Sequence, residues 1–248
     1  MAIVYEQGDL SVLAQYPPVR CDTHFLHLIA RTRAFFTQPG VTWVSLGSVL
    51  EDVRNGVNVG TDLYSMDPTD VLYISVSQIK EHGLVTKNQN YLIADVHQAR
   101  GFFRVERDML LVTRSGTVGV ALSSNHPSFE LDDYTYVPSG FVITGRVKPG
   151  ISADTLASYI NLSDVQTYLR AMAAGACQRN ISQDTLNELP VPESLLDGSA
   201  ELADVFARHE LDAATVVRRI REDERQLRAL KQTLSEEVRQ RLAAGKVQ

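Results

Sequence analysis

Residues 105–119, VERDMLLVTRSGTVG, place a short apolar run before a polar turn and then resume the apolar pattern. Residues 109–113 are apolar or β-branched and have the length of a buried strand, and residues 117–122 form a second such run. Between the two runs, Ser115-Gly116 can supply the positive φ angle that a tight turn requires, because glycine has no Cβ to clash. This stretch therefore predicts two strands joined by a turn.

The strand pattern extends outward from this stretch over most of residues 41–147. Residues 71–76 (VLYISV) and 140–144 (GFVIT) are rich in β-branched and aromatic residues and are bounded by turn residues. We expect a mostly antiparallel β core.

After Pro149-Gly150 the apolar spacing becomes helical and continues until Gly175. Ser182 is placed to cap a short further helix, which Pro190 and Pro192 would end. The central unit, residues 41–192, is therefore predicted to be α+β, with helices flanking the β core. Residues 1–40 are expected to form an N-terminal arm with one helix from His24 to Phe36.

The last segment, residues 193–248, differs in kind. From Ser199 to Lys246 it has no proline and one glycine, Gly245, so we expect a single long helix. Its seam positions are spaced alternately by four and three residues, the rhythm of a coiled coil. They are Leu202, Phe206, His209, Ala213, Val216, Ile220, Asp223, Leu227, Leu230 and Leu234. Pairing with another long helix is favoured over a tail folded back on its own domain, because the stripe is narrow and continuous.

The composition excludes several classes of protein. A net charge of −6 argues against coating nucleic acid by bulk electrostatics, so contact with DNA would need a local basic face. No apolar run approaches the roughly 18 residues of a membrane span, and the start lacks a signal-peptide pattern, so a cytoplasmic protein without membrane contact is expected. Cys21 and Cys177 lie outside any metal-ligand spacing and are interpreted as plain thiols.

Catalytic and cofactor motifs are not evident in the sequence. Asp67-Pro68-Thr69-Asp70 fails as the Asn/Asp-Pro-Pro-aromatic tetrad of an adenine methyltransferase. The Gly116–Gly119 pair lacks the lysine and the spacing of a phosphate-binding loop. We therefore expect no catalytic residue, no cofactor and no metal.

Three stretches in order resemble the target-recognition domain of the specificity subunit of type I restriction-modification enzymes. The first contains residues 43–49 (WVSLGSV), Asn55-Gly56, residues 73–79 (YISVSQI) and Gly83. The second is residues 105–119, similar to the family's strand-turn-strand. The third is residues 175–182 (GACQRNIS) followed by Leu186, Leu189 and residues 190–192 (PVP). Their order over residues 41–192, with a long helix after them, makes chance resemblance improbable.

This resemblance implies a non-catalytic subunit of a restriction system, active in phage defence. It would bind double-stranded DNA and direct a DNA methyltransferase subunit, and in a restriction complex a nuclease/translocase subunit, to a target sequence. The family commonly has two recognition domains and two long helices, whereas this chain has one of each. The family's Glu- and Gln-rich start to the helix is also replaced by residues 193–198, ESLLDG. The single copy implies a half-subunit that forms a homodimer through its C-terminal helix.

Candidate contact residues follow from these patterns. For DNA they are Lys80, Lys87, Arg100, Arg104, Arg114, Ser115, Gln178, Arg179 and Asn180. For the helix interface they are Leu202, Phe206, Val216, Ile220, Leu227, Leu230 and Leu234.

Alternatives remain open at this point. Gln178 and Asn180 can instead tie their loop to the fold, and exposed arginines are by default solvated. A protein-interaction scaffold that retains the recognition fold is the alternative function, and a stand-alone nuclease is a third.

Overall fold

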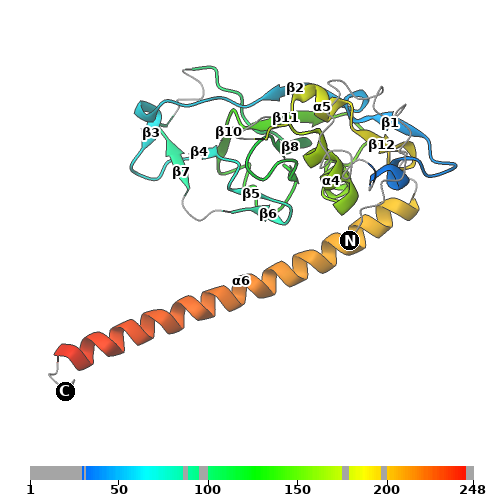
Figure 1. The fold of residues 1–248 in the computed structure, drawn as a ribbon. Coiled ribbons are helices and arrows are strands. Elements are labelled where there is room, and N and C mark those ends of the chain that lie inside the picture. The colour runs from blue at the N-terminus through cyan, green and yellow to red at the C-terminus, as the bar shows by residue number, and fades with distance from the viewer. Residues whose placement is uncertain are drawn as a thin grey trace, which may run out of the picture. The chain divides into compact units, whose positions relative to one another are not determined.

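The computed structural model describes residues 30, 32–85, 89–94, 100–174, 179–196 and 200–243. The chain divides into two compact units, Met1–Ser199 and Ala200–Gln248. The described part of the first unit is α+β with mostly antiparallel sheets, as predicted, and that of the second is one helix (Figure 1).

The central sheet of the first unit is antiparallel and has the order β2-β11-β8-β9. Its strands are β2 (Leu50–Asn55), β11 (Val142–Val147), β8 (Met109–Thr113) and β9 (Ala121–Ser123). All five residues of β8 are buried, which explains its continuous apolar run. β8 and β11 pair in a register that places Thr113 opposite Val142 and Met109 opposite Arg146.

The second sheet has the order β10-β4-β7-β3 and is mixed, because β10 and β4 run parallel. Its strands are β10 (Thr135–Pro138), β4 (Val71–Ile74), β7 (Asn90–Leu92) and β3 (Tyr64–Ser65). Alternate residues of β4 point to opposite faces. Leu72 and Ile74 belong to a core cluster with residues of the central sheet, whereas Val71 and Tyr73 belong to a second cluster with Leu92. Both faces of β4 are thus buried.

The two ends of the first unit meet in a small antiparallel sheet of β1 (Trp43–Ser45) and β12 (Pro190–Pro192). Residues 32–36 are helical, and the Phe36 ring lies 5.6 Å from the Trp43 ring and 5.0 Å from the Tyr168 ring between centroids. The predicted helix from His24 therefore exists in its described part, while residues 24–29 and 31 lie outside the described residues. Figure 1 shows β1 and β12 at one end of this unit and β3 and β7 at the other.

Three helices follow the central sheet. They are α3 (Ala153–Ile160), α4 (Ser163–Met172) and α5 (Gln183–Asn187), and α3 packs against β8 and β9. Ser182 caps α5 as predicted, because its side chain accepts a hydrogen bond from the Thr185 amide. A short β5-β6 pair (Ile79–Lys80 and Gly83–Leu84) completes the first unit's described strands.

Three predicted strands are wrong at their ends, and one of them, predicted at 140–144, is β11, which begins at Val142 and continues to Val147. Residues 117–120 form a turn, and β9 begins only at Ala121, because Gly119 has a φ of +86° that a strand does not adopt. The predicted strand at 71–76 ends at Ile74, where the Gln78 side chain accepts a hydrogen bond from the Ser75 amide at 2.9 Å and holds a turn.

The long helix, α6, runs from Ala200 to Ala243 over 44 residues. The sequence predicts this helix from Ser199, one residue before it begins. Ahead of it, Glu193–Leu195 form a 3₁₀ turn in which Leu195 is buried and the Glu193 amide donates to the Thr42 carbonyl. None of the described helices is long and apolar enough to cross a membrane. Cys21 and Cys177 lie outside the described residues.

Candidate nucleic-acid interface

The loop of residues 114–120, between β8 and β9, is where the three family-like stretches meet. Ser115 pairs with Asn180 as an isolated antiparallel bridge, and the Ile181 amide donates to the Arg114 carbonyl at 3.1 Å. Gly116 lies beside Val76, since a Cβ built on Gly116 would be 3.7 Å from a Val76 methyl carbon. Stretches that are distant in sequence therefore form one site around this loop.

The 114–120 loop is held by hydrogen bonds on both sides. The Gly119 amide donates to the Thr113 carbonyl at 2.8 Å, and the Thr113 hydroxyl donates to the Thr117 carbonyl. From α4, the buried Gln166 side chain donates to the Gly119 carbonyl at 2.6 Å and to the Ile160 carbonyl at 2.9 Å. The loop is therefore positioned by the helices behind it, and its exposed residues keep a defined location.

Basic side chains surround this loop, and we call Lys80, Arg114, Arg170 and Arg179 the turn surface. Lys80, Thr117 and Arg170 line one open pocket of about 280 Å³, together with Glu81, His82, Asn161 and Gln166. Lys80 is half-buried on β5, and Arg170 and Arg179 are exposed. These cations lie beside hydrogen-bonding groups that are neutral except for the Glu81 carboxylate, and such a set can meet DNA phosphates and base edges.

Arg114 is the most constrained member of the turn surface. Its amide donates to the Phe141 carbonyl at 2.8 Å, and its side chain is half-buried. Its Nε is buried and has no hydrogen-bond partner among the described residues. The Arg114 backbone is therefore held in place, and its side chain has a buried Nε that is unpaired among the described residues.

The other predicted DNA contacts have varied positions. Ser115 is 1% exposed, so in this structure its side chain is structural and cannot meet a base; its backbone bridge to Asn180 is what it contributes. The Asn180 backbone also exchanges hydrogen bonds with Ala174 at 2.8 and 2.9 Å, which agrees with the alternative that Asn180 ties the loop to the fold. Arg100 is in an exposed turn. Lys87 and Gln178 lie outside the described residues.

Arg104 belongs to a different site, which we call the arginine pocket. This open pocket of about 410 Å³ is lined by Asp52, Arg54, Phe102, Phe103, Arg104, Glu106 and Arg146. Arg146 lies opposite Met109 at the start of β8, whereas Arg114 follows the end of β8. The arginine pocket and the turn surface are thus near opposite ends of the same strand, roughly 14 Å apart along it.

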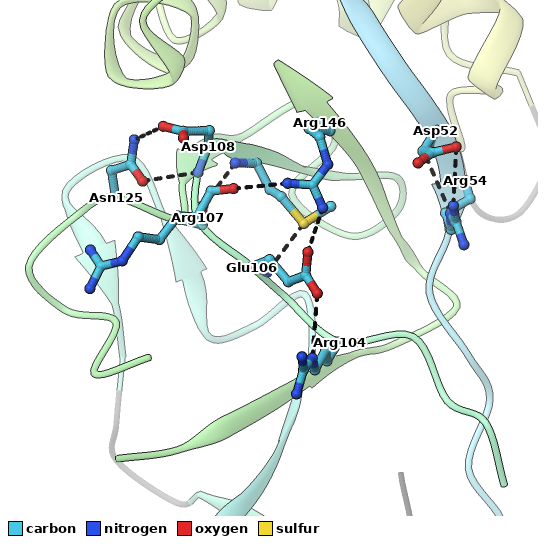
Figure 2. A network of polar contacts seen from close by, with 10 residues as sticks. Asp52, Arg54, Arg104, Glu106, Arg107, Asp108, Asn125 and Arg146 are labelled. Carbon is cyan, nitrogen blue, oxygen red and sulfur yellow. Dashed lines mark hydrogen bonds and ion pairs between the residues drawn. The ribbon is translucent and has the colours of Figure 1, made fainter. Parts of the chain in front are cut away.

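The arginine pocket contains a carboxylate between two guanidinium groups (Figure 2). An Arg146 Nη2 contacts Glu106 Oε2 at 2.5 Å, and Arg104 Nε contacts Glu106 Oε1 at 3.4 Å. The hydrogen bond from Arg146 lowers the pKa of Glu106 below its ordinary value, against a smaller opposing effect of partial burial. Glu106 is therefore ionised at neutral pH.

Sequence reasoning missed Arg54 and Arg146. Arg54 is on β2 and Arg146 is on β11, and no motif marks either position. They come near Arg104 only because β2 and β11 pair in the central sheet. Only the pairing of β2 with β11 identifies these two residues, and no local sequence pattern gives that pairing.

The described residues form no metal-binding site. The parts of the chain that the structure describes contain no group of three or more His, Cys, Asp or Glu side chains arranged to hold a metal ion.

The fold of this chain is similar to that of solved proteins. No protein-family model matches the sequence, and no curated protein matches it. Among solved structures, the S subunit of a type I restriction-modification system from M. genitalium is 15% identical over 69% of this chain and 39% of that chain, with a TM-score of 0.45. A structure described as showing complex assembly and conformational transition of the type I R-M system is 14% identical over 90% of this chain and 54% of that one, with a TM-score of 0.52.

The HsdS subunit from Thermoanaerobacter tengcongensis is also 14% identical, over 78% of this chain and 45% of that chain, with a TM-score of 0.50. This chain spans about half the length of these solved chains or less. The last two likenesses show that the chain shares its fold with the HsdS subunit and with a chain of a type I R-M system, as the sequence resemblance predicted.

Proposed function

We propose that this chain is a non-catalytic specificity subunit whose first unit recognises a sequence in double-stranded DNA. The observation that carries this proposal is the convergence of the three family-like stretches on one loop bordered by the turn surface. The shared fold with S subunits supports it. In the cytoplasm the chain would direct an adenine-specific DNA methyltransferase subunit, and a nuclease/translocase subunit where one is present, to the target.

The turn surface divides into two roles on physical grounds. Lys80, Arg170 and Arg179 suit the phosphate backbone, since such contacts need charge and little orientation. Arg114 suits a base edge, because a guanidinium fork on a fixed backbone can address guanine O6 and N7 together.

The second unit is proposed to join two copies of the chain. Val216, Ile220, Leu227, Leu230 and Leu234 share the heptad seam of α6, and all are exposed in the single chain. Covering such a stripe with the same stripe of an antiparallel second copy buries both. A homodimer of this kind would present two recognition domains.

The test is selection from a random duplex library with the full-length chain, alone and with a co-expressed methyltransferase subunit. The native chain should enrich a defined motif. Arg114→Ala should reduce discrimination at one position by about 1–3 kcal/mol. Arg33→Ala, which removes an exposed arginine outside the turn surface, serves as the control and should leave the motif unchanged.

A protein-interaction scaffold is the second candidate, and the net charge of −6 is the observation that favours it. Stable binding to a partner subunit with no enriched motif, for both preparations, would reject DNA recognition and support the scaffold.

A further inference from the structure

The arginine pocket is not used by the proposed contacts of the turn surface, yet it carries its own organised polar groups. Arg54 contacts two other residues that line the pocket, Phe103 and Asp52. Its guanidinium carbon lies 4.7 Å from the centroid of the Phe103 ring, a cation–π contact. Its Nε donates to the Asp52 carbonyl at 3.3 Å, and its Nη2 lies 3.4 Å from Asp52 Oδ1.

These contacts occupy one edge of the Arg54 guanidinium and leave the other available. A guanidinium has five N–H donors in a planar fork, and the contacts with Asp52 use the Nε–Nη2 edge. The Nη1–Nη2 edge keeps one donor on each nitrogen, the arrangement that bidentate recognition requires. Because the Arg54 side chain is 46% exposed, this edge can meet a ligand.

The backbone is strained at Asp52, two residues before Arg54. Asp52 has a φ of +52°, and the β2–β11 register shifts between Thr144 and Arg146, as in a β-bulge. Among the described residues, Asp52 and Asp108 are the two non-glycine residues with positive φ, and Figure 2 shows Asp52 paired with Arg54 and Asp108 paired with Asn125. Such strain persists where the surrounding structure enforces it, often at binding sites.

The charge pattern distinguishes a base edge from a phosphate as the ligand. Three guanidinium groups, of Arg54, Arg104 and Arg146, stand with two carboxylates, of Asp52 and Glu106. A phosphate would be repelled by those carboxylates, one of which, that of Asp52, directly contacts Arg54. A base pair is neutral and offers both donors and acceptors, so it matches a mixed lining.

We propose that the arginine pocket reads a G·C pair in the major groove of the target duplex, with Arg54 donating to guanine and Asp52 accepting from the cytosine amino group. Arginine fits guanine O6 and N7, and a carboxylate fits cytosine N4. Asp52 remains 64% exposed beside Arg54, so the pair can address both bases. Glu106, held by Arg104 and Arg146, frames the pocket. This inference rests on the proposed function and adds a second recognition site to it.

The experiment compares duplex-library selection by the full-length native chain, Arg54→Ala and Arg54→Lys. We expect the native motif to contain a G·C pair whose preference falls about tenfold or more in Arg54→Ala, with the other positions unchanged. Arg54→Lys should not restore it, because an ammonium group lacks the planar fork. Arg107→Ala is the matched control, since Arg107 is an exposed arginine of the same network that pairs with Asp132 and does not line the pocket.

The outcomes separate this inference from the proposed function. A native motif that Arg54→Ala leaves unchanged overturns the inference and leaves the proposed function standing. A uniform loss of affinity for all duplexes, with a shallower salt dependence, identifies a phosphate contact and also overturns it. If the native chain enriches no motif, the proposed function itself fails.

Discussion

At the scale of single residues, Gly119 controls the shape of the 114–120 loop. Its φ of +86° lies in a region that side chains rarely adopt, and α4 packs closely over it. A Cβ at this position would lie 3.0 Å from Leu169 Cδ1 and 3.2 Å from Leu169 Cβ. The turn that carries Arg114 therefore depends on the absence of one methyl group.

Gly119→Ala should lower the free energy of unfolding by about 1–3 kcal/mol, through backbone strain and crowding against Leu169. Urea denaturation monitored by circular dichroism measures this change. Gly150→Ala is the control, because Gly150 has a φ of +88° with nothing within 4 Å of a Cβ, so it should show the backbone strain alone. Equal losses in the two variants would show that Leu169 does not crowd the loop.

At the scale of elements, α6 is a helix with an uncovered apolar stripe. Its 44 residues correspond to about 66 Å at ~1.5 Å per residue. Ile220 and Leu227, one heptad apart, are 51% and 52% exposed in the single chain. An amphipathic helix of this length is stabilised mainly by packing its apolar face, so we expect a second helix to cover the stripe.

Ile220→Asp combined with Leu227→Asp should convert the proposed homodimer to a monomer, because each dimer would bury four carboxylates at the seam. Sedimentation velocity of the full-length chain measures the change. Leu211→Asp with Gln232→Asp places the same charges on the outer face of the helix and should leave the dimer intact. An unchanged sedimentation profile in the seam variant would refute the coiled-coil assignment.

At the scale of the whole molecule, the net charge of −6 restricts the proposed binding of DNA. In the proposed complex, attraction to phosphates would come from the few cations that reach the duplex, while the remaining surface would be repelled. Binding should therefore depend less on salt than it does for strongly basic DNA-binding proteins, and base contacts should supply a larger share of specificity.

With Lys80, Arg170 and Arg179 at phosphates, the slope of log K against log salt should be about −3 for each recognition domain. Fluorescence anisotropy with the enriched duplex, at several salt concentrations, measures this slope. Lys80→Ala should make the slope shallower by about one and weaken all duplexes alike. A slope unaffected by Lys80→Ala would remove Lys80 from the interface.

The sequence by itself determined the features that depend on neighbouring residues. Residues 109–113 form a strand with the predicted bounds, Ser182 caps α5, and α6 is one long helix. Each follows from periodicity, capping or the lack of helix breakers within a few residues. The family-like order of motifs likewise predicted the fold.

Only the tertiary structure decided which distant segments meet. The parallel pairing of β10 with β4 and the turn at 117–120 depend on packing partners elsewhere in the chain, Gln166 and Leu169 in the case of the turn. The arginine pocket joins Arg54 to Arg146 across the β2–β11 pairing. Side chains more than 90 residues apart become neighbours through strand register, and register is set by the burial of whole sheets, which no local pattern encodes.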